Sequence, residues 1–388
     1  MASIFFNILP RLRPSSSPSI RFKSIPLFRS SHSVSSTLSA TNLDPYVSCI
    51  KLVFSHSLTK PWGVFGTDNS IPASLRRFSN PSPFKKPRKV LIVKKPNDLR
   101  ATTVLESLLS FIQNQEPLVE LFVDHPDTRA RRFVRGEHID LVIALGGDGT
   151  VLHVASLFRQ GECPDILGFN LGTIGFLLPF PVEGCEKVLK QVLDGKVKRE
   201  ERMRLSCVFR PSTQHSHPPD QSQTEADQIA LSAVNEVSLH RSQHPHMTPI
   251  HISIDGQHLT TVVADGLVVS TPTGSTAYSC SAGGPIVHPA VDALLITPIC
   301  PRSLSFRPLV VPADVRVELT LDSKARATAE LALDGISSRI FHPGQSLLVG
   351  RSAYPIRLFS PGDGWIEDLN GMLNFNRSFA SKTNGEIY

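Results

Sequence analysis

The chain has 388 residues, of which 40% are hydrophobic and 19% are charged, a composition typical of a soluble globular protein with room for two domains. Its net charge of +6 comes from residues 1–97, which hold 15 Lys and Arg and two acids and so leave 25 basic and 32 acidic residues for 98–388. Because the body is mildly acidic and no apolar run approaches about 18 residues, we expect no nucleic-acid partner and no membrane span.

The N-terminus reads "MASIFFNILPRLRPSSSPSIRFKS", which is rich in Arg and Ser, and no acid precedes Asp44. It lacks the continuous apolar core of a secretory signal. Such a composition is typical of an organelle transit peptide. We therefore expect residues 1–85 to be a disordered leader and the protein to lie in the mitochondrial matrix; a plastid or cytoplasmic location is the alternative.

Cysteine and histidine show no metal-ligand pattern. The six cysteines are scattered with no C-x-x-C pair, which indicates reduced thiols in an intracellular compartment. None of the clustered histidines has a Cys or a carboxylate at a familiar ligand spacing; these are His215, His217, His240, His244 and His246. We expect no protein-bound metal site.

Residues 86–200 alternate between short β-branched runs and segments with apolar residues at helical spacing. The expected strands are 88–95, 118–124, 139–145 and the start of 165–179, and the expected helices are 98–115, a segment from about 150, and 182–195. This alternation predicts a Rossmann-like α/β domain, whose parallel sheet is covered by helices on both faces.

After about residue 200 the pattern changes to short runs of alternating apolar and polar residues. Turn signals such as Asp255-Gly256 and Asp334-Gly335 separate these runs. The pattern predicts an all-β domain over residues 201–365, most simply a β-sandwich.

Two segments stand apart from this second domain. Residues 211–228 are polar and low in apolar side chains, so we expect a flexible surface insertion. Residues 366–388 form a C-terminal tail, and "GWIEDLNGMLNFN" at its start is compatible with a short helix that packs against the first domain.

The sequence "GGDGT" (146–150) follows an apolar strand and precedes a helix. Backbone N–H groups at a helix N-terminus suit phosphate, and glycine allows the phosphates to come close. A carboxylate in such a place is useful if it faces a hydroxyl that attacks a phosphoryl group, or if it holds Mg²⁺. The alternative is a tight turn in which Asp148 only caps the helix.

A second constellation is "DGLVVSTPTGSTAYSCSAGGPIVHP" (265–289), in which many hydroxyl side chains and glycines follow an apolar strand. Such a sequence indicates hydrogen bonds to a hydroxylated ligand that approaches the backbone closely. A Ser/Thr-rich loop without a ligand is the alternative interpretation.

Together these segments resemble the NAD kinase family. The resemblance is carried by the 146–150 turn, the Asn235-Glu236 pair, the 265–289 block and "PRSLSFRPLVVP" (301–312). It runs from about Lys89 to Ser360, and the long block is highly specific. The Gly-Gly-Asp-Gly turn alone also occurs in lipid kinases and phosphofructokinases.

NAD kinases transfer the γ-phosphoryl group of ATP to the 2′-hydroxyl of the adenosine ribose of NAD. The resemblance implies that Asp148 orients and deprotonates this hydroxyl and that Mg²⁺ accompanies ATP. It also implies that the phosphates are surrounded by Gly146, Gly147, Gly149 and Thr150.

The resemblance also implies contacts with the dinucleotide. Phe176 would pack against adenine, with a core phenylalanine as the alternative, and Asn235 and Glu236 would bond adenine or ribose. Asp334 would lie at the edge of the site, unless it only forms a type I′ turn. The residues implied to hold the nicotinamide side and adenine are Asp265, Thr276, Ala277, Tyr278 and Ser281. Because a neighbouring subunit contributes in this family, a homodimer or homotetramer is expected.

One position departs from some relatives. Two residues before Asp265, certain NAD-specific enzymes carry a charged side chain, whereas this chain has Val263. An uncharged residue would repel neither redox form, so we expect NADH to be accepted as well as NAD.

Two other functions are alternatives to the kinase. A lipid kinase with the same glycine turn would need an exposed apolar ligand surface, and it leaves the 265–289 block unexplained. A catalytically silent dinucleotide-binding regulator would have no need to keep Asp148.

Overall fold

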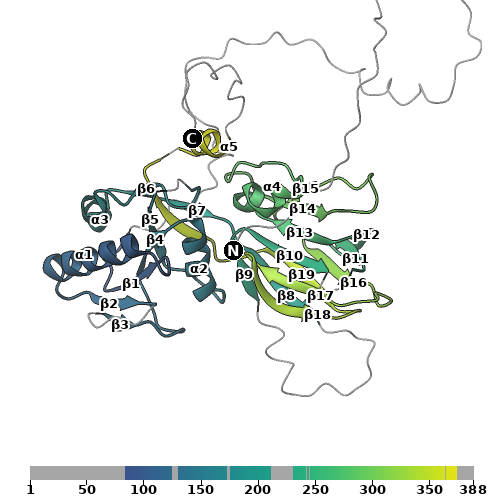
Figure 1. Ribbon diagram of the computed structural model, residues 1–388, viewed down its shortest axis with the longest axis horizontal. Helices are drawn as coiled ribbons and strands as arrows, with labels where there is room; N and C mark the ends of the chain where they lie inside the picture. Colours follow the sequence, from purple (N-terminus) through teal and green to yellow (C-terminus); the bar gives the residue numbers. More distant parts are fainter. Residues whose placement is uncertain are drawn as a thin grey trace, which may run out of the picture. The chain divides into compact units, whose positions relative to one another are not determined.

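The computed structural model describes residues 84–124, 130–172, 175–210, 230–241, 243, 245–362 and 364–373. Residues 1–83 of the expected leader and the whole expected insertion at 211–228 lie outside the described residues. The chain divides into two units, Met1–Ser70 and Ile71–Tyr388, and every described residue belongs to the second. Within that unit the elements form an α/β lobe and a β lobe, labelled in Figure 1.

The α/β lobe is built on one sheet with the order β3-β2-β1-β4-β5-β20-β7, and β6 pairs with β5. All of its paired strands are parallel except β7, which runs antiparallel to β20. Its strands are β1 (Lys89–Lys94), β2 (Glu120–Val123), β3 (Arg131–Arg132), β4 (Leu141–Gly146), β5 (Asp165–Asn170), β6 (Phe180–Pro181), β7 (Lys198–Arg202) and β20 (Ile356–Ser360).

Helices cover both faces of this sheet, as the alternating pattern predicts. They are α1 (Leu99–Gln115), α2 (Asp148–Leu157) and α3 (Cys185–Leu193). Val90 and Ile92 of β1 pack in the apolar cluster that includes α1 and α3, whereas Leu91 and Val93 pack in the cluster that includes α2. Successive strand residues therefore face opposite helical layers, which explains the unbroken apolar run in β1.

The β lobe contains two six-stranded antiparallel sheets, with the orders β15-β14-β13-β10-β17-β18 and β12-β11-β16-β19-β8-β9. One buried apolar cluster draws residues from both sheets, so the lobe is a β-sandwich. Its strands are β8 (Leu205–Arg210), β9 (Leu231–Ala233), β10 (Glu236–Arg241), β11 (Thr248–Ile254), β12 (Gln257–Ala264), β13 (Gly266–Ser270), β14 (Ala293–Ile299), β15 (Leu309–Pro312), β16 (Val317–Leu321), β17 (Ala329–Leu333), β18 (Ile336–Phe341) and β19 (Ser346–Arg351).

The predicted fold class, a Rossmann-like α/β domain followed by a β-sandwich, is confirmed. The predicted boundary is wrong at one place, because residues 356–360, assigned to the 201–365 domain, form β20 of the α/β sheet. This strand pairs with β5 and β7, and Ile356 and Phe359 are almost fully buried. Its run of apolar residues is compatible with either sheet, so the sequence pattern alone does not assign it.

A buried arginine joins the two lobes at the step from β7 to β8. Arg204 is 1% exposed, and its guanidinium donates hydrogen bonds to the backbone carbonyls of Phe158 (3.0 Å), Gly161 (2.6 Å) and Tyr354 (2.5 Å). Burial lowers the pKa of Arg204, but these carbonyls satisfy its N–H groups. The end of α2 is thereby fixed to the start of the β lobe.

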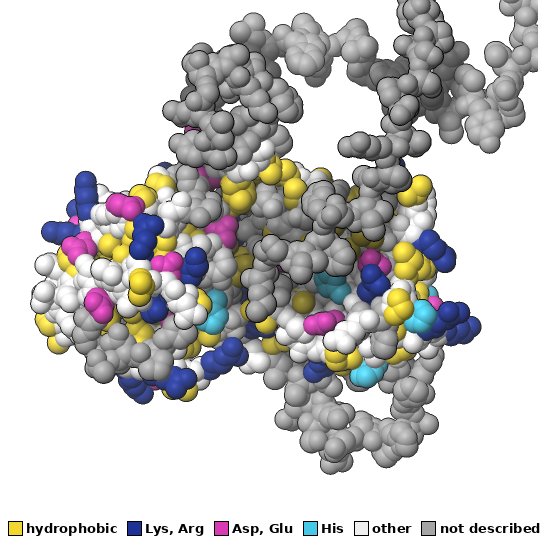
Figure 2. Space-filling model, in the orientation of Figure 1, with side chains coloured by type: hydrophobic (Ala, Val, Ile, Leu, Met, Phe, Trp, Pro, Cys, Tyr) yellow, Lys and Arg dark blue, Asp and Glu magenta, His cyan; other side chains and the backbone are white. Residues whose placement is uncertain are grey.

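The tail begins with the helix α5 (Trp365–Leu373), which matches the short helix expected there. Figure 1 shows α5 beyond the end of β20. The indole of Trp365 meets the imidazole of His288 edge-on, with ring centres 4.6 Å apart. No helix in the described part of the chain is long and apolar enough to cross a bilayer. Figure 2 shows basic and acidic side chains interspersed over the face in view.

Candidate active site

Asp148 is the first residue of α2 and follows the turn at the end of β4. Its Oδ2 accepts a hydrogen bond from the backbone N–H of Phe176 and its Oδ1 from that of Leu177, both at 3.0 Å. Burial raises the pKa of the Asp148 carboxyl, and these two N–H groups act in the opposite direction. The segment after β5 therefore fixes the orientation of the carboxylate.

Glycines around Asp148 fall into two kinds. A Cβ on Gly175 would collide with Oδ1 of Asp148, and a Cβ on Gly146 would collide with the Thr150 hydroxyl. By contrast, a Cβ on Gly147 or Gly149 would meet no described atom within 4 Å. The first pair is required by the packing of the protein itself, whereas the second pair faces open space at the helix N-terminus, as an approaching phosphate would need.

Thr150 was expected to face the phosphates, but its side chain is 8% exposed. Its hydroxyl oxygen lies 3.4 Å from the Gly147 nitrogen, as part of the first turn of α2. Thr150 therefore shapes the turn, and a contact between its hydroxyl and a ligand stays a prediction.

The Asn235-Glu236 pair lies at the start of β10, where Asp334 holds its backbone. The Asp334 carboxylate accepts hydrogen bonds from the backbone N–H groups of Val234 (2.9 Å), Asn235 (2.7 Å) and Glu236 (3.2 Å). Asp334 has φ 51° and begins the turn with Gly335, so the turn is present. Its expected position at the edge of the ligand site stays a prediction. Burial raises the pKa of Asp334.

Glu236 has an unusual carboxyl group. It is 6% exposed, and its Oε2 is buried without a hydrogen-bond partner among the described residues. Burial and then the charge of Asp334 raise the pKa of Glu236 to about 7, while the backbone N–H of Tyr278 lowers it. A buried polar atom without a partner costs free energy, so a ligand hydroxyl that bonds Oε2 would be stabilised here.

The hydroxyls of the 265–289 block are mostly bonded within the protein. The Ser270 hydroxyl donates to the Asn235 carbonyl (3.1 Å), and the Thr271 hydroxyl donates to the Val234 carbonyl (2.7 Å). Ser279 and Thr297 bond each other at 2.9 Å. The expectation that the many hydroxyls serve a ligand is therefore wrong for these residues, which fix the loop against the Asn235 turn.

The remaining expected contact residues lie in the 3₁₀ helix η4 (Thr273–Thr276) and the helix α4 (Tyr278–Ser281) or beside them. Thr276, Ala277 and Tyr278 are half-buried, and Ser281 is exposed. The Tyr278 ring stacks on His240 of β10, with ring centres 5.3 Å apart and an interplanar angle of 14°. This contact places an aromatic pair next to Glu236.

Asp265 lies between β12 and β13 and is engaged by a neighbouring cation. Its Oδ1 is 2.9 Å from Nε of Arg241 at the end of β10. The carboxylate is partly exposed and can accept further hydrogen bonds. A ligand that binds Asp265, as expected from the sequence, would therefore share its carboxylate with Arg241.

The helix α2 connects the two groups of residues. Val151 and Val154 of α2 pack in one cluster with Val234, which precedes Asn235. Just after α2, Nη2 of Arg159 donates to the carbonyl of Leu333, the neighbour of Asp334. Asp148 and the Asn235 turn are thus held by the two ends of one rigid helix and its contacts.

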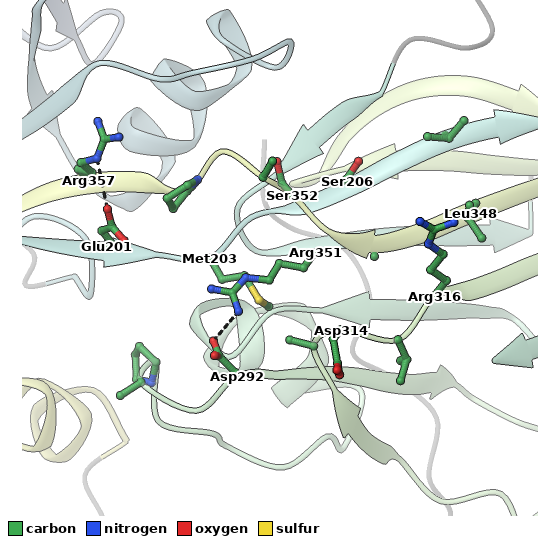
Figure 3. A pocket seen from close by; sticks show the side chains of 18 residues that line it. Glu201, Met203, Ser206, Asp292, Asp314, Arg316, Leu348, Arg351, Ser352 and Arg357 are labelled. Carbon is green, nitrogen blue, oxygen red and sulfur yellow. Dashed lines mark hydrogen bonds and ion pairs between the residues drawn. The ribbon is translucent and has the colours of Figure 1, made fainter. Parts of the chain in front are cut away.

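Two cavities lie near the junction of the lobes. One of about 900 Å³ is lined by Arg351 and Asp292, 3.1 Å apart, and by Arg357 and Glu201, 3.4 Å apart, as Figure 3 shows. None of the expected site residues lines it, and four of its six charged side chains are engaged in these two ion pairs. A second cavity of about 750 Å³ is lined by Phe176 and Leu177 and adjoins Asp148.

The donor set at the turn is one carboxylate. No group of three or more His, Cys, Asp or Glu side chains comes together in the described part of the chain. Mg²⁺ that arrives on a nucleotide needs only one or two protein carboxylates, and Asp148 fits that requirement. Of the clustered histidines, His215, His217 and His244 lie outside the described residues.

Several residues that position the site could not be recognised from their side-chain type. The backbone N–H groups of Phe176 and Leu177 bind Asp148 whatever their side chains are. Burial and then the charges of Glu367 and Asp148 raise the pKa of Asp368 in α5, so the charge on Asp148 also influences this tail helix. In the sequence, only the glycine of the Gly175-Phe176 pair could have indicated the close contact with Asp148.

Comparison with known proteins agrees with this geometry. The model of the ATP-NAD kinase N-terminal domain matches residues 90–197, and that of the ATP-NAD kinase C-terminal domain matches residues 234–360. The first range lies in the α/β lobe, and the second covers most of the sandwich together with β20.

Individual relatives show the same likeness. The chain is 34% identical over 324 residues to the mitochondrial NADH kinase pos5 of Schizosaccharomyces pombe, and the aligned region covers 80% of each chain. It is 36% identical over 255 residues to the chloroplastic NAD kinase 2 of Arabidopsis thaliana, covering 63% of this chain and 25% of that one. A crystal structure of yeast NADH kinase complexed with NADH matches with a TM-score of 0.67 and 34% identity, over 76% of this chain and 90% of the other.

Proposed function

The chain belongs to the NAD kinase family, and from this premise we propose that it transfers the γ-phosphoryl group of ATP to the 2′-hydroxyl of the adenosine ribose of NAD and NADH. The observation that carries this proposal is the fixed carboxylate of Asp148 beside two open glycines. The family matches give no support to a lipid kinase or to a silent binding protein.

Asp148 is the proposed general base. Each of its oxygens accepts one backbone N–H and keeps further capacity for the ribose hydroxyl. Burial raises the pKa of Asp148, which makes the carboxylate a stronger base than an exposed aspartate. As the ribose oxygen bonds the γ-phosphorus and the bond from that phosphorus to the β-phosphate oxygen breaks, the hydroxyl proton passes to Asp148 and ADP leaves.

The turn supports the phosphates. Gly147 and Gly149 let them approach the N-terminus of α2, where the backbone N–H groups and the helix dipole favour an anion. Mg²⁺ bound to ATP would neutralise charge on the transferred group, and Asp148 is the carboxylate of this turn that would hold it.

On the sandwich side, Asn235, Glu236 and the segment from Thr276 to Ser281 would bind the dinucleotide. The unpaired Oε2 of Glu236 supports this assignment, because a ribose hydroxyl would give it the missing hydrogen bond. Asp265 and Phe176 would contribute a further polar contact and an apolar contact.

Both redox forms of the acceptor are proposed as substrates. Val263 in β12 is uncharged, and its carbonyl accepts the backbone N–H of Arg302 at 2.9 Å. One relative is named an NADH kinase. We expect turnover with both NAD and NADH when they are measured side by side, and undetectable NADH phosphorylation would contradict this part.

Location and assembly are further parts of the proposal. The Arg- and Ser-rich start of the chain and a mitochondrial relative support the mitochondrial matrix, while a chloroplastic relative supports a plastid instead. Import of the full chain into isolated mitochondria and plastids distinguishes the two. Sedimentation of the purified protein tests the proposed homodimer or homotetramer.

The activity is tested with the full chain, both acceptors and two donors, ATP and polyphosphate. NADP formed from NAD is detected with an NADP-specific dehydrogenase, and NADPH is detected directly by chromatography. We expect product with MgATP and either acceptor. Absence of product with every combination, from protein that is folded and binds NAD, would exclude kinase activity.

A further inference from the structure

The cavity of about 750 Å³ beside Asp148 lies between the α/β sheet and α5. Its walls come from the segment after β5, from the neighbouring strands β7 and β20, and from α5. Half of the side chains on these walls are apolar, among them Phe176, Leu177, Pro179, Phe359, Trp365 and Ile366, and several others are charged. A cavity of this size and character suits a small organic ligand such as a nucleobase.

This cavity adjoins the proposed catalytic base, Asp148, through two residues of its wall. Phe176 and Leu177 line it, and the same two residues donate their backbone N–H groups to the Asp148 carboxylate. Asp368 of α5 also lines the cavity, and burial and then the charges of Glu367 and Asp148 raise the pKa of Asp368. A ligand in the cavity would therefore have one end next to Asp148.

Most of the proposed dinucleotide contacts lie elsewhere, and Phe176, which lines this cavity, is the one proposed contact that the two spaces would share. None of the residues expected to hold NAD in the β lobe lines the cavity; these are Asn235, Glu236, Asp265, Thr276, Ala277, Tyr278 and Ser281. Phosphoryl transfer between two nucleotides at one carboxylate needs a binding site for each nucleotide. In-line transfer also requires donor and acceptor to approach the transferred phosphorus from opposite sides. The cavity under α5 supplies the second space.

We propose that this cavity binds the adenine base of the phosphoryl donor, MgATP, with Trp365 of α5 against the base. This inference rests on the proposed kinase function and assigns the donor subsite within it. The contact of Trp365 with His288 orients the indole, and stacking of a base on an aromatic side chain is a common source of nucleotide affinity.

Polar groups in the wall set the orientation of the donor. Arg202 lines the cavity, and its Nε is buried without a hydrogen-bond partner among the described residues, so a ring nitrogen of adenine would satisfy it. The other charged side chains of the wall are Lys198, Arg199, Glu200, Glu201, Glu367 and Asp368. Glu200 is paired with Arg202, Glu201 with Arg357, and Arg199 with Asp165. The two acids of α5, Glu367 and Asp368, would repel a phosphate chain under this helix. The base therefore enters the cavity, and the triphosphate extends out of it toward Gly147 and Gly149.

Trp365 itself reports on this site. The chain contains two tryptophans, Trp62 and Trp365, so the full-length Trp62→Phe variant has a single indole. In the absence of NAD, we expect MgATP to change its fluorescence with a half-saturation near the KM for ATP. Magnesium tripolyphosphate, which has no base, should leave the fluorescence unchanged. No response to MgATP, or an equal response to tripolyphosphate, would overturn the proposal.

Kinetics provide an independent test. Trp365→Ala should raise the KM for ATP about tenfold while the KM for NAD stays within about twofold, and Trp365→Phe should restore most of the loss. Met372→Ala, on the same helix but outside the cavity wall, is the matched control. An increase in the KM for NAD instead, or no change in either constant, contradicts the assignment.

The two proposals fail separately. If NADP forms normally but Trp365 neither responds to MgATP nor affects its KM, the cavity assignment is wrong and the kinase function stands. If MgATP changes the fluorescence but no NADP forms, the kinase function is wrong and the nucleotide site stands.

Discussion

Each lobe holds an aspartate by backbone N–H groups, but the two surroundings differ. Asp148 in the α/β lobe accepts two such groups and lies beside Gly147 and Gly149, which face open space. Asp334 in the β lobe accepts three and is 8% exposed. An Asp-Gly pair in a sequence therefore does not by itself indicate a carboxylate that faces a ligand; the open space beside Gly147 and Gly149 is what distinguishes Asp148 from Asp334.

The largest effect is expected at Asp148. Asp148→Asn removes the proposed base and should lower kcat by about 10²-fold or more, while the dissociation constant for NAD stays within about twofold. Steady-state kinetics and calorimetric titration measure the two quantities. Asp194→Asn, at an exposed position after α3, is the control. A kcat within threefold of the parent protein would remove Asp148 from the chemistry.

Asp334 should show the opposite pattern. In Asp334→Asn the amide NH₂ replaces an acceptor that faces buried N–H groups, so the free energy of unfolding should fall by about 3 kcal/mol. Urea denaturation measures this change, and kcat of the folded protein should stay within about threefold.

The matched control for Asp334 is Asp255→Asn. Asp255 also precedes a glycine and has φ 49°, which asparagine tolerates, but it lies in an exposed turn. It should lose less than about 1 kcal/mol. If Asp334→Asn raised the KM for NAD and left stability unchanged, Asp334 would belong to the binding site instead.

An effect of intermediate size is expected at Glu236, where the free energy of unfolding should depend on pH. Burial raises its pKa from 4.5 to about 7 in the folded protein. Above pH 4.5 the unfolded chain releases this proton first, so the folded state binds more protons and stability falls as pH rises toward 7. Relative to Glu236→Gln, which stays neutral, the parent protein should lose on the order of 2 kcal/mol across this range.

Urea denaturation of both proteins at a series of pH values measures the effect at Glu236. Glu120→Gln in β2, where the glutamate is exposed, controls for a general charge effect. A difference between parent and Glu236→Gln that does not vary with pH would mean that the carboxylate is ionised in the folded protein.

The smallest effect is expected at the stacked pair of His240 and Tyr278. His240→Ala removes the ring contact and should raise the KM for NAD about threefold to tenfold without a change in kcat. His240→Phe keeps a stacked ring and should restore the KM. His246→Ala, at an exposed position, is the control. Equal constants for His240→Ala and the parent protein would show that the stack does not position Tyr278.

The sequence predicts most of the α/β lobe because its elements have strong periodicity. Val90 to Val93 form an unbroken apolar run, and Leu105, Leu108, Leu109 and Ile112 repeat at helical spacing, so both β1 and α1 were expected. The place of β20 could not be predicted, because a short apolar strand fits either sheet and only its pairing with β5 and β7 decides.

The site was predictable to a smaller extent. Asp148 is identifiable from its glycines, but Phe176 and Leu177 hold it by backbone groups that every residue except proline possesses. The Ser270 and Thr271 hydroxyls donate to backbone carbonyls of the protein. The sequence alone could not tell whether these hydroxyls would face a ligand or the protein. Arg204 bonds carbonyl groups, so no acidic partner in the sequence indicates its role.

The position of β20 has a consequence for biosynthesis. The ribosome completes the whole sandwich before it releases the strand that separates β5 from β7 in the first sheet. Until residues 356–360 have emerged, β7 has no strand to pair with and the edge of β5 stays open. A nonsense mutation just before Ile356 should therefore damage the α/β lobe first, and a nascent chain stalled there would be a natural client for chaperones.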